Sequence, residues 1–559
     1  MVRRPGQYMV LAVVGILIMA AVVPAAPAED KLTGDKALVV ELADKNAAMV
    51  KEIGSTIWGM PEIGLNEYRS SHYLANKLEE MGFDVERGVA QFPTAFVGTF
   101  TFGEGGPVIG LLAEYDALPG VSYDNPGENG HGCGHNLYCA GAFGTASILK
   151  EFMETQKVPG TIKVFGTPAE ENFDGKAWMG RQGVLKGVDM FFGFHGATKN
   201  TVPFGSNNAM DYKIYTFHGK SSHAGSAPDK GVSALDAVEI MNVAVNYLRE
   251  HVPMEVRMHY IISIGGEAPN VVPAIAQSKW FIRAPQRETV DDVVIKVDNA
   301  ARGSALAAGC TVDIDLVSAL HNKIPIRSAV DLAWKNYQLV GAPDFTAEDQ
   351  ESIKFLGLKE NIRTELEAPP ENPSQSYGSS DEGDVSWNAP LVSVQAANYA
   401  ADTAGHSIEL DKQANMDIAY KAHMQLIKVT ACTAVDLLTK PEELKKIKDD
   451  FAETMKGKEY KPGDKVMLDL KYFPEPPGVR AELPNKLSFK TTETIFDEAK
   501  DTIVNVYNGD ALIGIVTLSD PKEEYSITTK TGFKAEDILT VKYQLKGQPE
   551  IVYGYVKKY

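Results

Sequence analysis

Three short clusters of metal-binding residue types each follow an apolar run of strand length, and this pattern most narrows the folds open to the chain. The apolar runs are Val108–Ala113, Thr161–Phe165 and Met190–Phe194. The clusters that follow them are Glu114-Tyr115-Asp116, Glu170-Glu171 and His195, with His131-Gly132-Cys133-Gly134-His135-Asn136 between the first two runs. Helical patterns alternate with these runs. The order predicts an α/β fold with its chemistry at the carboxyl ends of the strands.

The residue types in these clusters form a coherent set of metal ligands. Thiolate, imidazole and carboxylate groups together suit zinc or a neighbouring first-row ion, whereas an all-oxygen set would indicate magnesium or calcium. Cys133 and His135 are close enough in sequence to share a site, and of the adjacent Glu170 and Glu171 one can bind metal while the other moves a proton. His406 follows another apolar run, Leu391–Gln395, and could close the site. The set predicts a metallohydrolase.

Each cluster also has a simpler interpretation when it is taken alone. A Glu-Glu pair is usually a solvated face, a histidine after a strand is usually structural, and a Cys-Gly-His turn is also compatible with a nucleophilic thiol beside an imidazole. The conjunction of three clusters along alternating strands and helices favours a metal centre. A cysteine-nucleophile hydrolase, and a secreted binding protein on an inactivated hydrolase scaffold, stay open as alternatives.

The motifs resemble those of the aminoacylase and carboxypeptidase type of metallopeptidases that use two metal ions. Within this family they are similar to the amidohydrolase branch, whose bridging aspartate is replaced by the cysteine of a Cys-Gly-His motif, and most of all to the B-subunit type of p-aminobenzoyl-glutamate hydrolases. The resemblance covers roughly residues 37 to 440. It is carried by Glu114–Gly120, Gly130–Leu137, Ser233–Glu239 and Asp384–Trp387.

The resemblance implies a catalytic domain with a mixed sheet flanked by helices and two divalent ions, zinc or manganese, or else cobalt. The implied ligands are Cys133, His135, Glu171, His195 and His406. Glu170 would be the general base, Asp116 would orient a ligand imidazole, and His223 of a partner subunit would stabilise the oxyanion. Glu114 stands where two-metal relatives place a histidine, so the partition of ligands between the ions stays open. The implied substrate is a small N-acyl amino acid, an aminobenzoyl-glutamate-like amide or a dipeptide.

Residues 209–325 show the order βαββαβ, which is the split ferredoxin-like unit. The strands are expected at Tyr212–His218, Met258–Ile264, Ala276–Ala284 and Thr311–Leu320, and the helices at Ser233–Arg249 and Val290–Ala308. The resemblance implies that this insertion is a lid that also carries a homodimer contact. Asn270 resembles the family's substrate-contacting asparagine. Arg283 could clamp a substrate carboxylate or could be a solvated strand arginine.

The amino terminus predicts export. Arg3 and Arg4 precede an uncharged stretch, Met9–Val23, that is shorter than the roughly 20 apolar residues of a spanning helix, and an Ala-x-Ala site precedes Glu29. Residues 1–28 are therefore predicted to be a signal peptide of a periplasmic or extracellular protein without stable membrane insertion after processing; an uncleaved anchor is the alternative. The expected catalytic domain spans 29–208 and 326–445, around a lid at 209–325.

Composition and the carboxyl-terminal residues complete the prediction. The formal net charge of −19 argues against nucleic acid as a partner, and four scattered cysteines do not form a disulfide framework. Residues 446–559 are expected to form a charged linker, with a helix as the alternative over 441–458, and a β-rich domain resembling a sandwich. Its expected strands are Val466–Phe473, Thr502–Tyr507, Ala511–Leu518, Ile538–Gln544 and Ile551–Val556, with a hairpin turn at Asn508-Gly509-Asp510.

Asp381 and Asp384 are candidates for orienting substrate or a ligand histidine.

Overall fold

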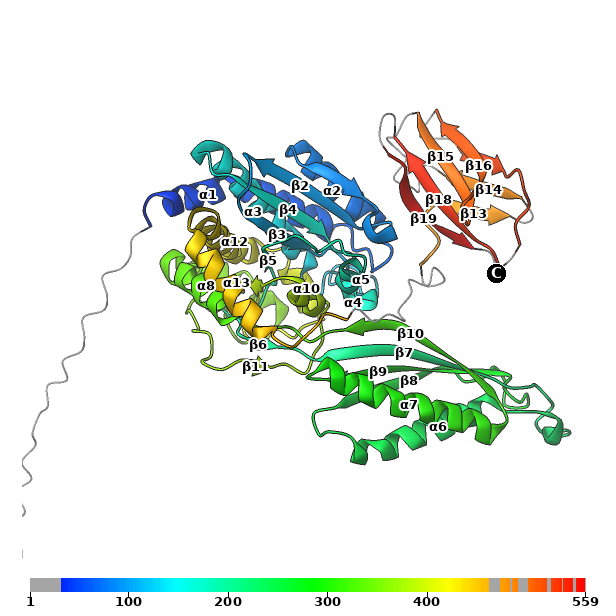
Figure 1. Cartoon of the computed structure of the whole chain (residues 1–559). Helices are drawn as coiled ribbons and strands as arrows, with labels where there is room; N and C mark the ends of the chain where they lie inside the picture. Colours follow the sequence, from blue (N-terminus) through cyan, green and yellow to red (C-terminus); the bar gives the residue numbers. More distant parts are fainter. Residues whose placement is uncertain are drawn as a thin grey trace, which may run out of the picture.

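The computed structural model describes residues 32–461, 473–482, 485–490, 501–519, 524–534, 536–545 and 549–557. The predicted signal peptide and nearly all of the strand predicted over Val466–Phe473 lie outside these residues. The described chain forms an α/β catalytic domain, a lid inserted into it and a β-rich carboxyl-terminal module (Figure 1). The predicted fold class is confirmed. Within the described part of the chain, no helix combines the length and apolarity that a membrane crossing requires.

The catalytic domain is built on a six-stranded mixed sheet in the order β1-β2-β4-β3-β5-β12. Neighbours among β4, β3, β5 and β12 are parallel, whereas β1 and β2 are antiparallel to their neighbours. The parallel strands are almost wholly apolar because helices cover both faces of the sheet. The strands are β1 Asp84–Arg87, β2 Phe96–Phe102, β3 Val108–Ala113, β4 Gly160–Gly166, β5 Met190–Gly193 and β12 Leu391–Ser393.

Three long helices pack together on one side of this sheet (Figure 1). They are α1 Asp35–Trp58, α3 His135–Gln156 and α12 Asp417–Thr439. Small residues let α3 approach its neighbours closely: a Cβ at Gly144 would lie 2.7 Å from a methyl group of Val50. The other helices of the domain are α2 Tyr68–Glu80, α4 Glu170–Phe173, α5 Gly175–Arg181, α8 Arg327–Val340, α9 Ala347–Glu351, α10 Glu382–Asn388, α11 Ile408–Gln413 and α13 Pro441–Thr454. The charged segment after residue 440 is thus helical.

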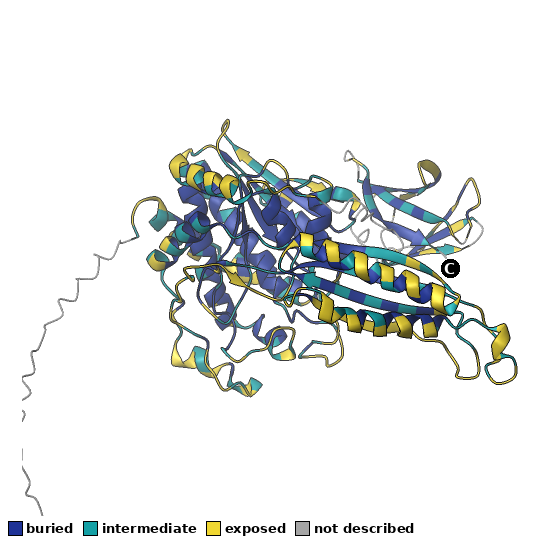
Figure 2. Ribbon diagram, turned by 60° about the horizontal axis from the view of Figure 1, so that its bottom comes forward, coloured by how far each residue is buried: buried dark blue, intermediate teal, exposed yellow. Residues whose placement is uncertain are grey.

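The lid has the predicted βαββαβ order. Its elements are β7 Ala209–His218, α6 Ala234–Leu248, β8 Arg257–Ile264, β9 Ile275–Ala284, α7 Arg287–Ala308 and β10 Thr311–Leu320. The strands form an antiparallel sheet in the order β10-β7-β9-β8, and α6 and α7 pack on it with their outer sides exposed (Figure 2). A short parallel pair, β6 Gly205–Ser206 with β11 Ser374–Gln375, lies where the chain leaves the catalytic domain. β8 is therefore an edge strand of the lid.

The carboxyl-terminal module consists, in its described residues, of two facing sheets with one shared core. One sheet contains β13 Val479–Glu482, β14 Lys486–Lys490 and β17 Glu524–Thr528, and the other contains β15 Thr502–Asn508, β16 Ala511–Leu518, β18 Ile538–Gln544 and β19 Ile551–Lys557. The predicted hairpin joins β15 to β16, with Gly509 at φ +57°. The strands β13, β14 and β17 alternate apolar and polar residues but were not predicted, because each has only four or five residues and two apolar positions.

Candidate metal centre

The sheet brings the ligand clusters together at one edge. Glu114 and Asp116 follow β3 directly, Glu170 and Glu171 begin α4 after β4, and His195 follows β5. Because β4, β3 and β5 are parallel neighbours, their carboxyl ends meet. The distant residue 406 joins them through its own backbone, whose N–H donates to the carbonyl of Gly132 over 3.0 Å.

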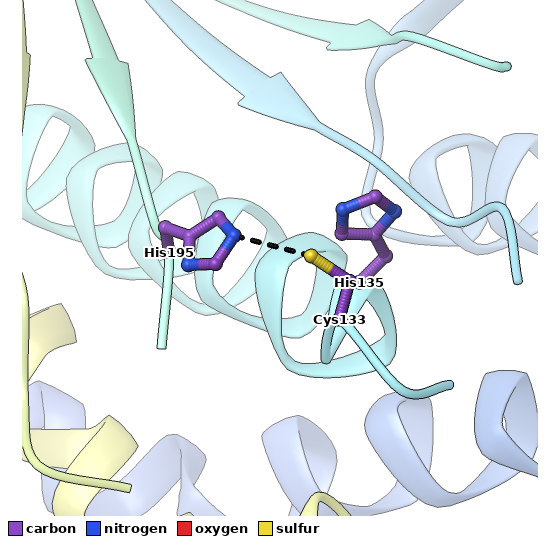
Figure 3. A group of neighbouring side chains, drawn as sticks. All are labelled: Cys133, His135 and His195. Carbon is purple, nitrogen blue, oxygen red and sulfur yellow. Dashed lines mark hydrogen bonds between the residues drawn. The ribbon is translucent and has the colours of Figure 1, made fainter. Parts of the chain in front are cut away.

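The Cys133-Gly134-His135 turn presents two ligands side by side at the start of α3 (Figure 3). Gly134 has φ +80°, and a Cβ at this position would lie 2.1 Å from the Tyr399 hydroxyl oxygen, so only glycine fits. The Cys133 Sγ lies 3.4 Å from the Nε2 of His195. The turn therefore points its thiol and imidazole toward the histidine that follows β5.

The candidate ligands form two groups that share Cys133. Cys133, His135 and His195 form the inner group, and Cys133, Glu171 and His406 form the outer group; within each, the ligand atoms lie within 4.8 Å of one another. The Glu171 Oε1 is buried without a hydrogen bond and lies 3.6 Å from the His406 Nε2. This unsatisfied buried oxygen, beside a thiolate and an imidazole, fits a divalent ion in the outer group, and the thiolate and two imidazoles of the inner group are donors that fit a second one.

Asp116 orients a residue of each group. Its Oδ1 accepts a hydrogen bond from the His135 Nδ1 at 2.8 Å, and its Oδ2 accepts one from the Glu171 backbone N–H at 2.9 Å. The His195 Nδ1 donates to the Gly196 carbonyl at 2.7 Å. These bonds turn the Nε2 atoms of both histidines toward Cys133 and fix their tautomers.

Charge pairing stabilises the thiolate form of Cys133 in the metal-free protein. Burial opposes ionisation of the thiol, but His135 and His195 together hold its pKa well below the usual range. Burial also opposes a charge on His195, yet the neighbouring thiolate raises the pKa of this imidazole to about 9. Burial and the Cys133 charge raise the pKa of Glu171 to about 8. The protonation states of Cys133, His195 and Glu171 therefore depend on one another.

Glu170 lies beside this centre, within 4.8 Å of ligand atoms of His135 and Glu171. Burial, together with the negative charges of Asp381 and Glu114, raises its pKa well above the usual range. A carboxylate with a raised pKa accepts a proton more readily than an ordinary glutamate, as a general base requires.

A buried lysine balances the acidic residues behind Glu170. The Lys176 Nζ lies 2.7 Å from the Glu114 Oε1 and 2.5 Å from the Asp381 Oδ1. Glu114 also approaches the His135 Nε2 at 3.1 Å but belongs to neither ligand group. Sequence reasoning missed Lys176, since a lysine inside a short helix is ordinarily a surface residue. Asp384 binds the side chain and backbone N–H of His321, both at 2.9 Å, so it does not orient a ligand histidine.

The candidate substrate residues of the lid lie in two places. His223 is exposed, and its Nδ1 accepts hydrogen bonds from the backbone N–H groups of Gly225 and Ser226, at 3.1 Å each. The Asn270 carbonyl accepts from the Ala224 N–H in the same loop region. Arg283 pairs in register with Met210 at the opposite end of the sheet, over the Phe281 ring, and its Nε is buried without a hydrogen bond.

The fold and the centre define a class of metal-dependent hydrolases with a lid inserted into the catalytic domain. Residues 110–470 match peptidase family M20/M25/M40, and the chain belongs to this family. It is 33% identical over 430 residues to the B subunit of p-aminobenzoyl-glutamate hydrolase from Escherichia coli K12, covering 69% of this chain and 88% of that protein. The resemblance seen in the sequence is confirmed.

Two further proteins are similar to this chain, one in sequence and one in structure. The human Xaa-Arg dipeptidase is 29% identical over 430 residues, covering 74% of this chain and 90% of that one. The crystal structure of an aminobenzoyl-glutamate utilization protein from Klebsiella pneumoniae aligns with a TM-score of 0.53 at 18% identity, covering 70% of this chain and 98% of that one, and shows the shared fold. With these hydrolase relatives and its family, the chain is an enzyme that hydrolyses amide bonds.

Proposed function

We propose that this enzyme uses two divalent metal ions to cleave the amide bond of a small N-acyl amino acid, an aminobenzoyl-glutamate-like compound or a dipeptide. The observation that carries the proposal is the thiol of Cys133 shared between two ligand groups, with Glu170 beside them. The names of the hydrolase relatives support the substrate classes. Thiolate and imidazole donors favour zinc and the Glu171 carboxylate also admits manganese, with cobalt as a functional replacement.

The residues divide the chemistry between them. Ions held by the inner and outer groups would lower the pKa of a water and polarise the amide carbonyl. The Glu170 carboxylate takes a proton from the attacking water and returns it to the amine nitrogen as the C–N bond breaks. The products are a carboxylic acid and a free amine, so atoms balance with one water consumed. The thiol of Cys133 serves as a ligand and not as the nucleophile.

A hydrolysis screen tests this proposal. The purified enzyme is assayed for amine release from aminobenzoyl-glutamate, Xaa-Arg dipeptides and N-acyl amino acids, before and after chelation and after return of zinc, manganese or cobalt. Chelation should abolish activity, and return of the metal should restore it. Glu170→Gln keeps its metal but loses at least about 10²-fold in kcat. A covalent acyl-enzyme on Cys133, or activity that survives chelation, contradicts the proposal.

We also propose that the enzyme works as a homodimer in which His223 serves the partner subunit's site. The edge strand β8 and the outer side of α6 expose apolar side chains, among them Ile261 at 62% and Tyr247 at 75% exposed. A long apolar edge strand is a ready site for pairing with a second copy. In addition, the ten-residue strand β7 places the His223 loop about 30 Å from the point where the lid leaves its own catalytic domain.

Subunit exchange tests the shared site. Glu170→Gln and His223→Ala are each expected to lose activity, but their hybrid dimer would contain one site with both native groups. Mixing equal amounts should recover up to about a quarter of native activity, since about half of randomly formed dimers are hybrids with one competent site of two. If tagged subunits exchange and no activity returns, His223 does not act across the dimer.

Export is proposed from the sequence alone. The basic residues Arg3 and Arg4, the uncharged stretch after them and the Ala-x-Ala site before Glu29 support it. The mass of the protein recovered from the extracytoplasmic fraction of expressing bacteria should correspond to a chain that begins at Glu29. A full-length chain confined to the cytoplasm contradicts the proposal.

A further inference from the structure

The carboxyl-terminal module packs against the segment that carries Glu170 and Glu171. Phe473, which is 1% exposed, lies with its ring centroid 5.8 Å from that of Phe173, the last residue of α4, and 5.2 Å from that of Phe92. Tyr555 of β19 holds Phe473 from the module side at 5.3 Å. The contact is thus a buried aromatic cluster shared by the module and the catalytic domain.

The helix α4 depends on its surroundings for its position. It has four residues, too few for a self-supporting helix, and the non-glycine residues at its two ends, Ala169 and Asp174, have φ of +58° and +56°. Such backbone conformations persist only where neighbouring structure enforces them. At the first end the Ala169 N–H donates to the buried Glu67 carboxylate at 2.7 Å; at the second end Phe173 packs on Phe473.

The module contacts the first end as well. Tyr68, adjacent to Glu67, is part of the module's apolar core, and its ring lies 5.3 Å from that of Tyr553. The Tyr555 hydroxyl donates to the Gln91 carbonyl at 3.0 Å, in a short 3-10 segment whose Ala90 carbonyl accepts from the Trp178 indole in α5. The elements before and after the two glutamates are therefore both tied to the module.

We propose that the carboxyl-terminal module positions α4, with Phe473 acting through Phe173 to hold Glu170 and Glu171 in register with the other groups of the centre. This inference rests on the proposed function for the role of Glu170. Glu171 is a ligand of the outer group and not of the inner one, although it also lies within 4.8 Å of His135 and Glu170, so a displaced α4 weakens the outer group and leaves the Cys133, His135 and His195 group in place. Phe473 is a positioning residue, since it touches neither ligands nor substrate.

The test uses the full chain with Phe473→Ala. Displacement of α4 should lower kcat at least about tenfold, because small errors in the placement of a catalytic group cost one to two orders of magnitude, while KM stays within about twofold. On dialysis against a chelator, the variant should lose about one metal equivalent from the outer group at a concentration where the wild type keeps both. Phe473→Leu, which refills most of the cavity, should recover most of both properties.

Two controls separate positioning from general loss of structure. Phe489, also fully buried in the module's core, lies on β14, and Phe489→Ala should leave metal retention and kcat within about twofold of the wild type. If Phe473 acts through Phe173, the double variant Phe173→Ala, Phe473→Ala should lose no more than Phe173→Ala alone.

Three results overturn the positioning role: metal retention of Phe473→Ala equal to that of the wild type, an equal loss in Phe489→Ala, or additive losses in the double variant. Metal retention needs no substrate. If the wild-type enzyme hydrolyses none of the amides tested, the proposed function fails. The metal retention of Phe473→Ala still shows whether the module positions Glu171.

Discussion

The inner and outer groups share Cys133 but are built in opposite ways. His135 in the inner group is 1% exposed, begins a long helix and is fixed by Asp116. His406 in the outer group has a side chain 57% exposed and a backbone at φ +58° on a loop that joins the site from more than two hundred residues downstream. One group is preorganised by the sheet, and the other is completed by a loop and a four-residue helix.

Because of this difference, we expect the two groups to bind their ions with different affinities. Ligands fixed by packing and hydrogen bonds lose little freedom when a metal binds, whereas an exposed side chain must be ordered by the metal itself. The inner group should therefore fill first and release its ion last. The two groups share the Cys133 thiolate, so the loss of Cys133 should weaken metal binding by both groups.

The largest expected effect comes from removing the shared ligand. Cys133→Ser should release both ions on dialysis and lower kcat/KM by at least about 10³-fold, since a neutral hydroxyl replaces a thiolate ligand of both groups. The matched control is Cys139→Ser, because Cys139 is buried in α3 and belongs to neither group. Elemental analysis measures the metal. Retention of one full equivalent by Cys133→Ser would show that the groups do not share this ligand.

The comparison itself is tested by removing one histidine from each group. His406→Ala should leave about one metal equivalent and fast exchange of the other, whereas His135→Ala should lose the more tightly held ion and impair the outer one through Cys133 and Asp116. Competition with a fluorescent chelator gives both affinities. If the two variants lose metal to the same extent, the proposed difference between the groups is wrong.

A smaller effect is expected from Asp116, which binds no metal but contacts both groups. Asp116→Asn keeps the shape but lets the amide present an N–H to the His135 Nδ1 and removes the charge that supports the imidazole. Metal affinity should fall about 10- to 100-fold. The conservative control Asp381→Asn removes a carboxylate that pairs with Lys176 and should change affinity less. Equal losses in both variants would indicate a general electrostatic effect.

The strands that precede the ligand clusters, the βαββαβ order of the insertion and the clustering of the ligands could be predicted because each rests on local pattern. Apolar runs such as Val108–Ala113 mark parallel strands, and parallel strands force their carboxyl ends to one edge. What sequence reasoning could not supply depends on packing between distant residues. Lys176 forms its ion pair with Asp381, and Phe473 packs against Phe173. Each contact joins segments that are far apart in the sequence, and no periodic pattern in either segment indicates the other.

The core beneath the inner group provides an effect on stability and not on metal binding or catalysis: an acid-dependent loss of stability. Burial lowers the pKa of His423, which packs under α3, to about 3. An unfolded histidine titrates near 6.5, so the unfolded state binds more protons below that pH, and stability is lost as pH falls from about 6.5 toward 3. The slope from this one residue is about 1.4 kcal/mol per pH unit.

His423→Gln should therefore flatten the fall in thermal unfolding temperature of the metal-free enzyme between pH 6 and pH 4. His251, an exposed histidine of the lid, gives the matched control, and His251→Gln should leave the slope unchanged. Because the comparison uses slopes, a constant loss of stability from the buried amide does not affect it. An unchanged slope in His423→Gln would mean that the core under α3 admits a charge, and the inner group would then lose its rigid support.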